Sequence, residues 1–345
     1  MNALVITAPD PALAANVAFR TDWPDDAQPP AGHARVRTLC SALNHLDVWV
    51  AIGAMGKLPY PRVSGSDACG MVEAVGPGVE PAWVGTKVVL NAVQYAPESP
   101  RPFDGPAARF TAHTLLGEQT HGTHRAAFTA PVANLQAVAP DADPAEVAAM
   151  GLTFLTAYSM FAKAGIAPGQ SVLITGIGGG VALAALKIAN YLGCPVAVTS
   201  RHQSKLDRAK ALGAALCVLD TGADWSGEVR AFTSKRGVDV VIDSVGKATH
   251  LSSIKSLCRG GAFVTCGATS GGDATTDLSA VFWRQLRILG STMGSNSEFA
   301  AVVALYRAGA FKPVIDRVFP AAQGLAAFQR LHTAEQFGKI VLDWR

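Results

Sequence analysis

A glycine-rich turn at residues 176–180 lies between a short apolar run and an apolar helix, and it constrains the fold more than any other stretch. Ser171–Thr175 has the composition of a buried parallel strand, Val181–Leu192 is predicted to be a helix, and Pro195–Thr199 the next strand. Glycine is needed where such a turn is tight and where backbone approaches a phosphate. We therefore predict the first unit of a dinucleotide-binding fold; a flexible glycine loop in an ordinary α/β domain is the alternative. The residues expected to hold the diphosphate, with the help of the helix N-terminus, are Gly176, Gly178, Gly179, Gly180 and Val181.

The residues after the second predicted strand bear on which dinucleotide is bound. Cofactors without a 2′-phosphate are usually held by an Asp or Glu about 20 residues past the glycines. This chain has Ser200, Arg201 and, one turn further, Lys205 at that place, and its first carboxylate is inside the next predicted helix. These side chains can donate to a 2′-phosphate, which a carboxylate would repel. We predict NADP(H) rather than NAD(H); a solvated helix start is the other interpretation of Arg201 and Lys205.

Alternating strands and helices continue after this unit. Six strands with helices between them predict a doubly wound parallel sheet in an α/β protein. The predicted strands are Ser171–Thr175, Pro195–Thr199, Ala215–Leu219, Val238–Asp243, Ala262–Cys266 and Arg287–Ser291.

Residues 1–150 have a different sequence pattern from the alternating strands and helices that follow. Short runs rich in valine and alanine are separated by glycine and proline. This spacing predicts a β-rich, partly barrel-like domain. Tyr95–Pro106 is rich in turn residues and is predicted to be a surface loop. Glu298–Arg307 is predicted to be a helix, and Gly338–Leu342 a strand that rejoins the first domain. The predicted strands of the first domain are His33–Ala42, Ala68–Val75, Lys87–Val93 and Thr129–Val138.

Composition excludes several classes of protein. Of the 345 residues, 49% are hydrophobic and 16% charged, which argues against a disordered chain. A formal net charge of +3 without a Lys/Arg cluster argues against nucleic acid as a partner. We expect no transmembrane helix and no signal peptide. The six cysteines form no CxxC pair, so we predict a reduced, cytoplasmic protein.

Two stretches of the first domain, Ala42–Asp47 (ALNHLD) and Gly65–Gly70 (GSDACG), together with the glycine turn, resemble the medium-chain dehydrogenase/reductase superfamily. Further stretches resemble its zinc-free, quinone oxidoreductase-like members and the nearby zinc-type alcohol dehydrogenase-like proteins: Cys266–Gly271, Phe282–Leu286, Gly290–Ser295 and Phe337–Leu342. The resemblance implies a GroES-like catalytic domain at 1–152, completed by 294–345, and a Rossmann domain at 153–293. It also implies a homodimer formed by pairing the edge strand Arg287–Ser291, with a tetramer as the alternative.

The resemblance also addresses zinc. Zinc-dependent members hold the metal with a Cys in the first stretch, a His in the second and a Cys just before the Rossmann domain. Here the first two positions are Asn44 and Ser66, and no cysteine lies near residues 148–153. Asn and Ser are weak ligands for Zn²⁺, and Asp67 alone cannot rebuild the site. We expect no metal.

Without a Lewis acid, an unactivated ketone is hard to reduce, whereas an alkene conjugated to a carbonyl can delocalise the charge onto oxygen. We therefore predict zinc-independent hydride transfer from NADPH to a small-molecule quinone or α,β-unsaturated carbonyl compound. The alternatives are an alcohol dehydrogenase acting on a small alcohol or aldehyde, and an NADPH-binding protein with little turnover.

Three residues are candidates for the catalytic site. Asn44 is expected beside the nicotinamide or substrate oxygen, with a structural amide as the alternative. Asp47 braces the loop more readily than it acts as a base, and Tyr60 is a candidate proton donor. The candidates for the substrate pocket, each of which could instead be core, are Trp49, Met55, Tyr60, Phe103 and Trp283.

Further cofactor contacts follow from the resemblance. His45 matches a phosphate contact and Thr156 a position near the nicotinamide. The backbone after the fifth and sixth strands is expected to hold the carboxamide, and Lys339 to reach a phosphate. The residues after those strands are Cys266, Gly267, Ala268, Met293 and Gly294. A rival metal site, less favoured than surface or lid residues, would use His113, Glu118, His121 and His124.

Overall fold

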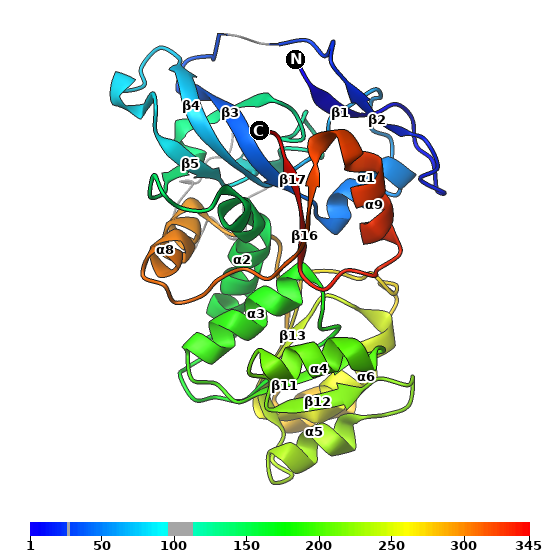
Figure 1. The fold of residues 1–345 in the computed structure, drawn as a ribbon. Coiled ribbons are helices and arrows are strands. Elements are labelled where there is room, and N and C mark those ends of the chain that lie inside the picture. The colour runs from blue at the N-terminus through cyan, green and yellow to red at the C-terminus, as the bar shows by residue number, and fades with distance from the viewer. Residues whose placement is uncertain (26–27, 96–112) are drawn as a thin grey trace. The chain divides into compact units, whose positions relative to one another are not determined.

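The chain, a computed structural model that describes residues 1–25, 28–95 and 113–345, divides into two compact units (Figure 1). Unit 1 comprises Met1–Leu152, Ser295–Ala308 and Pro313–Arg345, and unit 2 comprises Thr153–Gly294 and Gly309–Lys312. The chain thus leaves unit 1 after residue 152 and returns to it at Ser295. Each unit has its own sheet and its own core.

Unit 2 is built on a parallel sheet of six strands in the order β12-β11-β10-β13-β14-β15. The strands are β10 (Val172–Ile174), β11 (Val196–Ser200), β12 (Leu216–Leu219), β13 (Val238–Asp243), β14 (Leu257–Thr265) and β15 (Arg287–Gly290). Val172 is in register with Val196 on one side and Val240 on the other, and β10, β11 and β13 are almost wholly buried, as expected of strands covered on both faces. The doubly wound sheet is confirmed.

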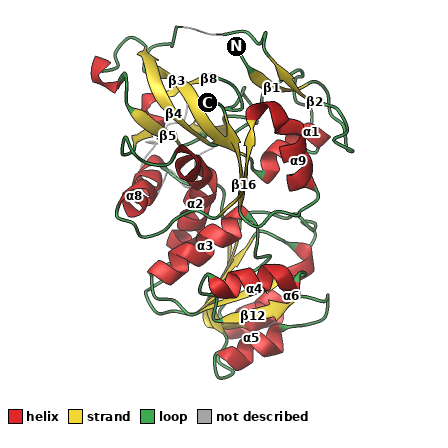
Figure 2. Cartoon of the chain, viewed as in Figure 1, coloured by secondary structure: helices red, strands yellow, loops and turns green. Residues whose placement is uncertain are grey.

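Helices connect these strands (Figure 2). They are α3 (Gly180–Tyr191), α4 (Gln203–Ala211), α5 (Ser226–Phe232), α6 (Lys247–Ser256) and α7 (Leu278–Arg284). The strand order reverses between β10 and β13, and ligands of such sheets bind at the carboxyl ends of the strands at this point.

Unit 1 contains a sheet of seven strands in the order β16-β17-β3-β4-β5-β9, with β8 also paired to β3. β16 and β17 are parallel and the other pairs antiparallel. The strands are β3 (His33–Ala42), β4 (Ala68–Val75), β5 (Lys87–Leu90), β8 (Ala127–Pro131), β9 (Leu135–Ala137), β16 (Ile315–Pro320) and β17 (Lys339–Asp343). Two-stranded pairs are β1 (Ala3–Ile6) with β2 (Val17–Arg20), and β6 (Val93–Tyr95) with β7 (His113–Leu115). The helices of this unit are α1 (His45–Ile52), α8 (Asn296–Arg307) and α9 (Gly324–His332).

Three predicted strands differ from the structure by more than one residue at an end. The predicted strand Lys87–Val93 ends at Leu90 as β5, and Val93 begins β6. Thr129–Val138 is divided into β8 and β9, because Pro131 ends the first and a 3-10 turn at Val132–Asn134 follows. β14 begins at Leu257, before the predicted Ala262, because Leu257 pairs with Val238 and the strand continues to Ala262 through a bulge that contains Gly260 and Gly261. Apart from Tyr95, the predicted loop at 95–106 lies outside the described residues.

A long apolar helix, α2 (Pro144–Ala164), was not predicted from the sequence. Asp143 accepts a hydrogen bond from the Ala145 N–H and begins it. Its length and apolar composition would suit a membrane span, but 78% of its most apolar stretch of 18 residues is buried inside the protein, as in a core helix.

Candidate functional site

The glycine turn of unit 2 runs from the end of β10 to the start of α3. Gly176 and Gly178 have φ values of +64° and +121°, which favour glycine, and a Cβ on Gly176 would lie 2.6 Å from Cγ2 of Val245. The Ile177 N–H donates to the carbonyl of Thr199 at 2.8 Å, which ties the turn to β11. A Cβ on Gly179, the residue that precedes α3, would meet no atom within 4 Å. The turn therefore leaves open space at a helix N-terminus, which fits a diphosphate.

At the end of β11, Ser200 is buried and accepts a hydrogen bond from the His202 N–H at 3.1 Å. Arg201 is exposed, and Lys205 is partly exposed in the first turn of α4. Asp220, at the end of the neighbouring β12, donates its N–H to the Ser200 carbonyl, but its carboxylate accepts from the Gly222 N–H. The side chains predicted to bind a 2′-phosphate therefore lie at or after the end of β11. Two of them, Arg201 and Lys205, are positively charged.

The residues predicted to surround the nicotinamide lie after β14 and β15 and on α2. The hydroxyl of Thr156 is 3.7 Å from the sulfur of Met293, which has a φ of +48° and is followed by Gly294. Cys266 donates its N–H to the carbonyl of Asp243, and Gly267 donates to the Thr265 hydroxyl. Burial raises the pKa of Cys266 to about 12, so this thiol is protonated at neutral pH and packs rather than reacts. Ala268 follows in the same loop.

Asp243, at the end of β13, was missed from the sequence. Its carboxylate is fully buried and accepts from the hydroxyls of Thr175 and Thr249, at 2.6 and 2.8 Å, and from the Gly246 N–H at 3.0 Å. It thereby fixes the β10 end beside the glycine turn. The feature of the sequence that could have identified Asp243 is a carboxylate at the end of an apolar strand.

In unit 1, Asn44, Asp67 and Lys339 form a buried polar triad. The Lys339 ammonium donates to Oδ1 of Asn44 at 2.6 Å and to Oδ2 of Asp67 at 2.8 Å, and Nδ2 of Asn44 donates to the same carboxylate oxygen at 2.9 Å. The exposed fractions of Asn44, Asp67 and Lys339 are 7%, 0% and 4%. The sheet explains the assembly, because Asn44 follows β3, Asp67 precedes β4 and Lys339 begins β17, and β3 pairs with both other strands.

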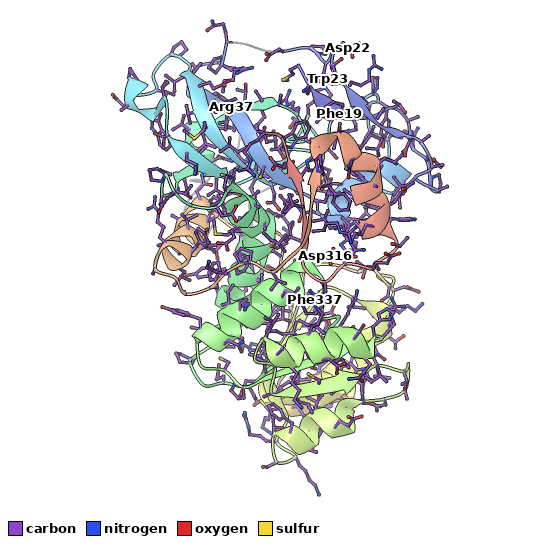
Figure 3. All side chains as sticks on the ribbon, in the orientation of Figure 1. Phe19, Asp22, Trp23, Arg37, Asp316 and Phe337 are labelled. Carbon is purple, nitrogen blue, oxygen red and sulfur yellow. The ribbon has the colours of Figure 1, made fainter. Side chains whose placement is uncertain are left out.

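The start of β17 is anchored firmly. Asp316 accepts from the Phe337 N–H at 3.1 Å and from the guanidinium of Arg330, and Figure 3 labels Asp316 and Phe337. Gly338 has a φ of +115°, and a Cβ there would lie 2.4 Å from the Val314 carbonyl oxygen. That carbonyl accepts from the Lys339 N–H at 2.8 Å. The backbone of Lys339 is therefore fixed. The ammonium of Lys339 has two partners within the triad, and the predicted role of this residue as a phosphate ligand stays a prediction.

Asp47 braces the adjacent loop. Its carboxylate is fully buried and accepts from the N–H groups of Asn44 and Gly65, at 2.7 and 2.8 Å. Nε2 of His124 lies 3.5 Å away, and Nδ1 of His124 is 2.9 Å from the Ser41 hydroxyl. Burial acts to raise the pKa of Asp47, but the His124 ring, the Asn44 N–H and the Lys339 charge hold that pKa below its usual range. The geometry matches the bracing role and offers no reason for a base.

The Tyr60 hydroxyl donates to the carbonyl of Val50 at 2.6 Å. Its ring packs against the core of unit 1, and so does the side chain of Met55. His45 is partly buried in α1, with its ring 6.3 Å from that of Trp49. Trp283 is 73% exposed on α7 of unit 2 and is not a core residue. Phe103 lies outside the described residues.

The rival metal site is not assembled within the described part of the chain. His124 faces Ser41 and Asp47, whereas Nδ1 of His121 accepts from the Val63 N–H at 3.3 Å. The described ranges contain no group of three or more His, Cys, Asp and Glu side chains that could hold a metal, and the His113 side chain lies outside them.

Two family models match the chain. One, described as an alcohol dehydrogenase GroES-like domain, matches residues 30–140, and the other, described as zinc-binding dehydrogenase, matches residues 180–308. A solved structure titled as an NAD-dependent alcohol dehydrogenase is 38% identical, with a TM-score of 0.91 and full coverage of both chains.

Among curated relatives, a zinc-type alcohol dehydrogenase-like protein of Schizosaccharomyces pombe is 30% identical and covers 90% of both chains. An acryloyl-coenzyme A reductase of Metallosphaera sedula is 25% identical over 92% of this chain and 94% of the relative. The chain is therefore similar over its length both to alcohol dehydrogenase-like proteins and to a reductase.

The zinc in the family model's description does not fit the triad. The Ser66 hydroxyl donates to the Leu116 carbonyl at 2.7 Å, and Asn44 offers an amide where a thiolate would be needed. The oxygens of Asn44 and Asp67 that could face a cation already bind the Lys339 ammonium. A zinc ion and this ammonium would compete for the same two oxygens.

Proposed function

Because this chain belongs to the medium-chain dehydrogenase/reductase family of oxidoreductases, we propose that it transfers hydride from NADPH to a carbon–carbon double bond conjugated to a carbonyl, as in an enone or a quinone, without zinc. The observation that carries the proposal is the Asn44–Asp67–Lys339 triad. In it a neutral amide stands at a position that the resemblance assigns to a metal ligand, and the Lys339 ammonium binds the oxygens of Asn44 and Asp67. The similarity to an acryloyl-coenzyme A reductase supports the same reaction class.

The nicotinamide cofactor supplies the hydride when it is bound. In the proposal the glycine turn and the N-terminus of α3 hold its diphosphate, and the residues after β11 bind its 2′-phosphate. The charges of Arg201 and Lys205 and the hydroxyl of Ser200 favour NADPH, whereas the neighbour titled as NAD-dependent favours the alternative. Thr156 and the backbone after β14 and β15 orient the nicotinamide.

A conjugated acceptor needs less help from the protein than a simple ketone. Hydride addition to the β-carbon moves the π electrons toward oxygen, and hydrogen bonds to that oxygen are sufficient stabilisation. A simple ketone would need a Lewis acid, which the donor set of Asn44, Ser66 and Asp67 does not favour.

An alcohol dehydrogenase is the second candidate, because the neighbour at 38% identity carries that title. It requires polarisation of an unactivated carbonyl. An NADPH-binding protein with little turnover is the outcome if no acceptor is reduced.

The test combines a metal assay with cofactor titrations and an acceptor screen. We expect substoichiometric zinc, tighter binding of NADPH than of NADH by fluorescence, and NADPH-dependent reduction of cyclohexenone or benzoquinone that EDTA does not inhibit. One zinc per chain together with EDTA-sensitive oxidation of small alcohols would establish the second candidate instead.

We also propose a homodimer formed through β15, the strand at one edge of the unit 2 sheet. Ile288 of β15 is 43% exposed, and α7 exposes Leu278, Phe282 and Trp283 by 73%, 66% and 73%. An edge strand beside such an apolar patch is complementary to a second copy of itself across a two-fold axis. The free state of all six cysteines agrees with the proposed cytoplasmic location.

Ile288→Lys is expected to convert the dimer to a monomer, because a charged side chain on an edge strand opposes pairing. Light scattering during size-exclusion chromatography measures the mass. Leu219→Lys is the matched control, since Leu219 is 42% exposed on β12 at the opposite edge of the sheet. If Leu219→Lys dissociates the dimer and Ile288→Lys does not, the interface lies at the β12 edge of the sheet, and the proposed interface at β15 is wrong.

A further inference from the structure

The Lys339 ammonium occupies a cation position within unit 1. Two oxygens face it, Oδ1 of Asn44 at 2.6 Å and Oδ2 of Asp67 at 2.8 Å. The Asn44 amide is oriented by its own N–H donation to Asp67, so its oxygen is directed to the lysine. Both oxygens are therefore committed to one positive charge.

Asp67 is held in a fixed position. Its second oxygen accepts from the Leu152 N–H at 2.6 Å, and its carbonyl accepts from the Thr123 hydroxyl at 2.9 Å. Gly151 makes room for it, since a Cβ there would lie 2.3 Å from Oδ1 of Asp67. A carboxylate fixed in this way places the ammonium as precisely as metal ligands place a metal.

An ammonium has three N–H donors, and two are used within the triad. In the described ranges no residue accepts from the third. The Lys339 side chain keeps 4% of its surface exposed, whereas that of Asp67 keeps none. A third N–H remains for an acceptor that comes from solvent or substrate.

We propose that the Lys339 ammonium is a catalytic electrophile that takes the place of the metal and donates its third N–H to the substrate carbonyl oxygen. This role rests on the proposed function. The substrate β-carbon gains a hydride and is reduced while the nicotinamide is oxidised. The alkene π pair becomes the π bond of an enolate, and the carbonyl π pair moves to the oxygen that Lys339 faces. A proton from water then forms the α-carbon–hydrogen bond, and the carbonyl is restored.

The test separates this role from the support that the charge pair gives to the fold. Lys339→Met alone leaves the Asp67 carboxylate buried without its cation and destabilises the unit. The double variant Asp67→Asn/Lys339→Met removes both charges. We expect it to melt near the parent temperature and to bind NADPH as the parent does, while single-turnover reduction of cyclohexenone slows by about 100-fold, as when one oxyanion donor is removed. Lys339→Arg, which keeps the charge, should retain part of the rate.

The control is Asp224→Asn/Lys255→Met, which removes an exposed pair of the same chemistry with N···O of 2.7 Å and should leave the rate unchanged. A double variant at 67 and 339 that reduces the enone at the parent rate would overturn the role and leave a structural charge pair. An increase in the NADPH Kd that accounts for the slower rate would make Lys339 a phosphate ligand instead. A parent that reduces neither enone nor quinone would overturn the proposed function and this role together.

A second measurement does not depend on turnover. Lys339→Ala leaves two oxygens facing an empty cation position, so ethylammonium should raise its melting temperature and have no such effect on the parent or on the double variant. Equal shifts in all three proteins would contradict the cation position itself.

Discussion

Arg201→Glu is expected to weaken binding of NADPH by roughly 100-fold and to leave binding of NADH within a few-fold of the parent. The change removes a charge-assisted hydrogen bond worth about 1.5–3 kcal/mol and adds repulsion toward a 2′-phosphate. Arg201 is exposed directly after β11, so the substitution disturbs no core packing. Fluorescence titration with both cofactors measures the two dissociation constants.

Lys210→Glu provides the matched control for Arg201→Glu. It makes the same change of charge at an exposed position in the last turn of α4, away from the β11 end. We expect it to leave NADPH binding close to that of the parent. An Arg201→Glu protein that binds NADPH as the parent does would refute the assignment of the 2′-phosphate to this strand end.

Asp47→Asn is expected to destabilise unit 1 by about 3 kcal/mol, because an amide nitrogen would replace one of two oxygens that accept buried N–H bonds. It also removes the charge that faces His124. Urea unfolding followed by circular dichroism and tryptophan fluorescence measures the effect as a shift of the unit 1 transition, since a chain of two units need not unfold in one step. Asp22→Asn, at an exposed residue labelled in Figure 3 that pairs with Arg20, should leave the midpoint unchanged.

The destabilisation by Asp47→Asn should depend on pH. The folded-state pKa of Asp47 lies below its usual value near 3.8, so its ionisation contributes stability that is present above that value. This contribution is lost as the pH falls through the folded-state pKa, and the difference between parent and variant should then shrink. If the difference in unfolding free energy between the parent and Asp47→Asn stays constant as the pH falls, the charge of Asp47 does not contribute to stability.

Local patterns in the sequence predicted much of the fold. The bounds predicted for His33–Ala42, Ala68–Val75 and Val238–Asp243 agree with the structure, because β-branched residues and their flanking turn residues are local signals. α2 was missed because a helix that is apolar on nearly every face has no amphipathic stripe to detect.

The candidate site was predicted less completely than the fold. The sequence singled out Asn44, Asp67 and Lys339 separately, but their contact joins residues 272 and 295 positions apart. Only the pairing of β3 with both β4 and β17 brings them together, and strand pairing at such separations leaves no local pattern. Asp243 presents the same difficulty, since the hydroxyls that surround it come from three separate segments of the chain.

Burial of the cysteines has a chemical consequence for a protein that handles conjugated acceptors. Enones and quinones alkylate thiolates, and a thiol must ionise before it can attack them. Burial raises the pKa of all six thiols, to about 12 for Cys40, Cys69 and Cys266. At neutral pH these thiols are therefore held in the protonated form, which disfavours their attack on the compounds that the protein is proposed to reduce.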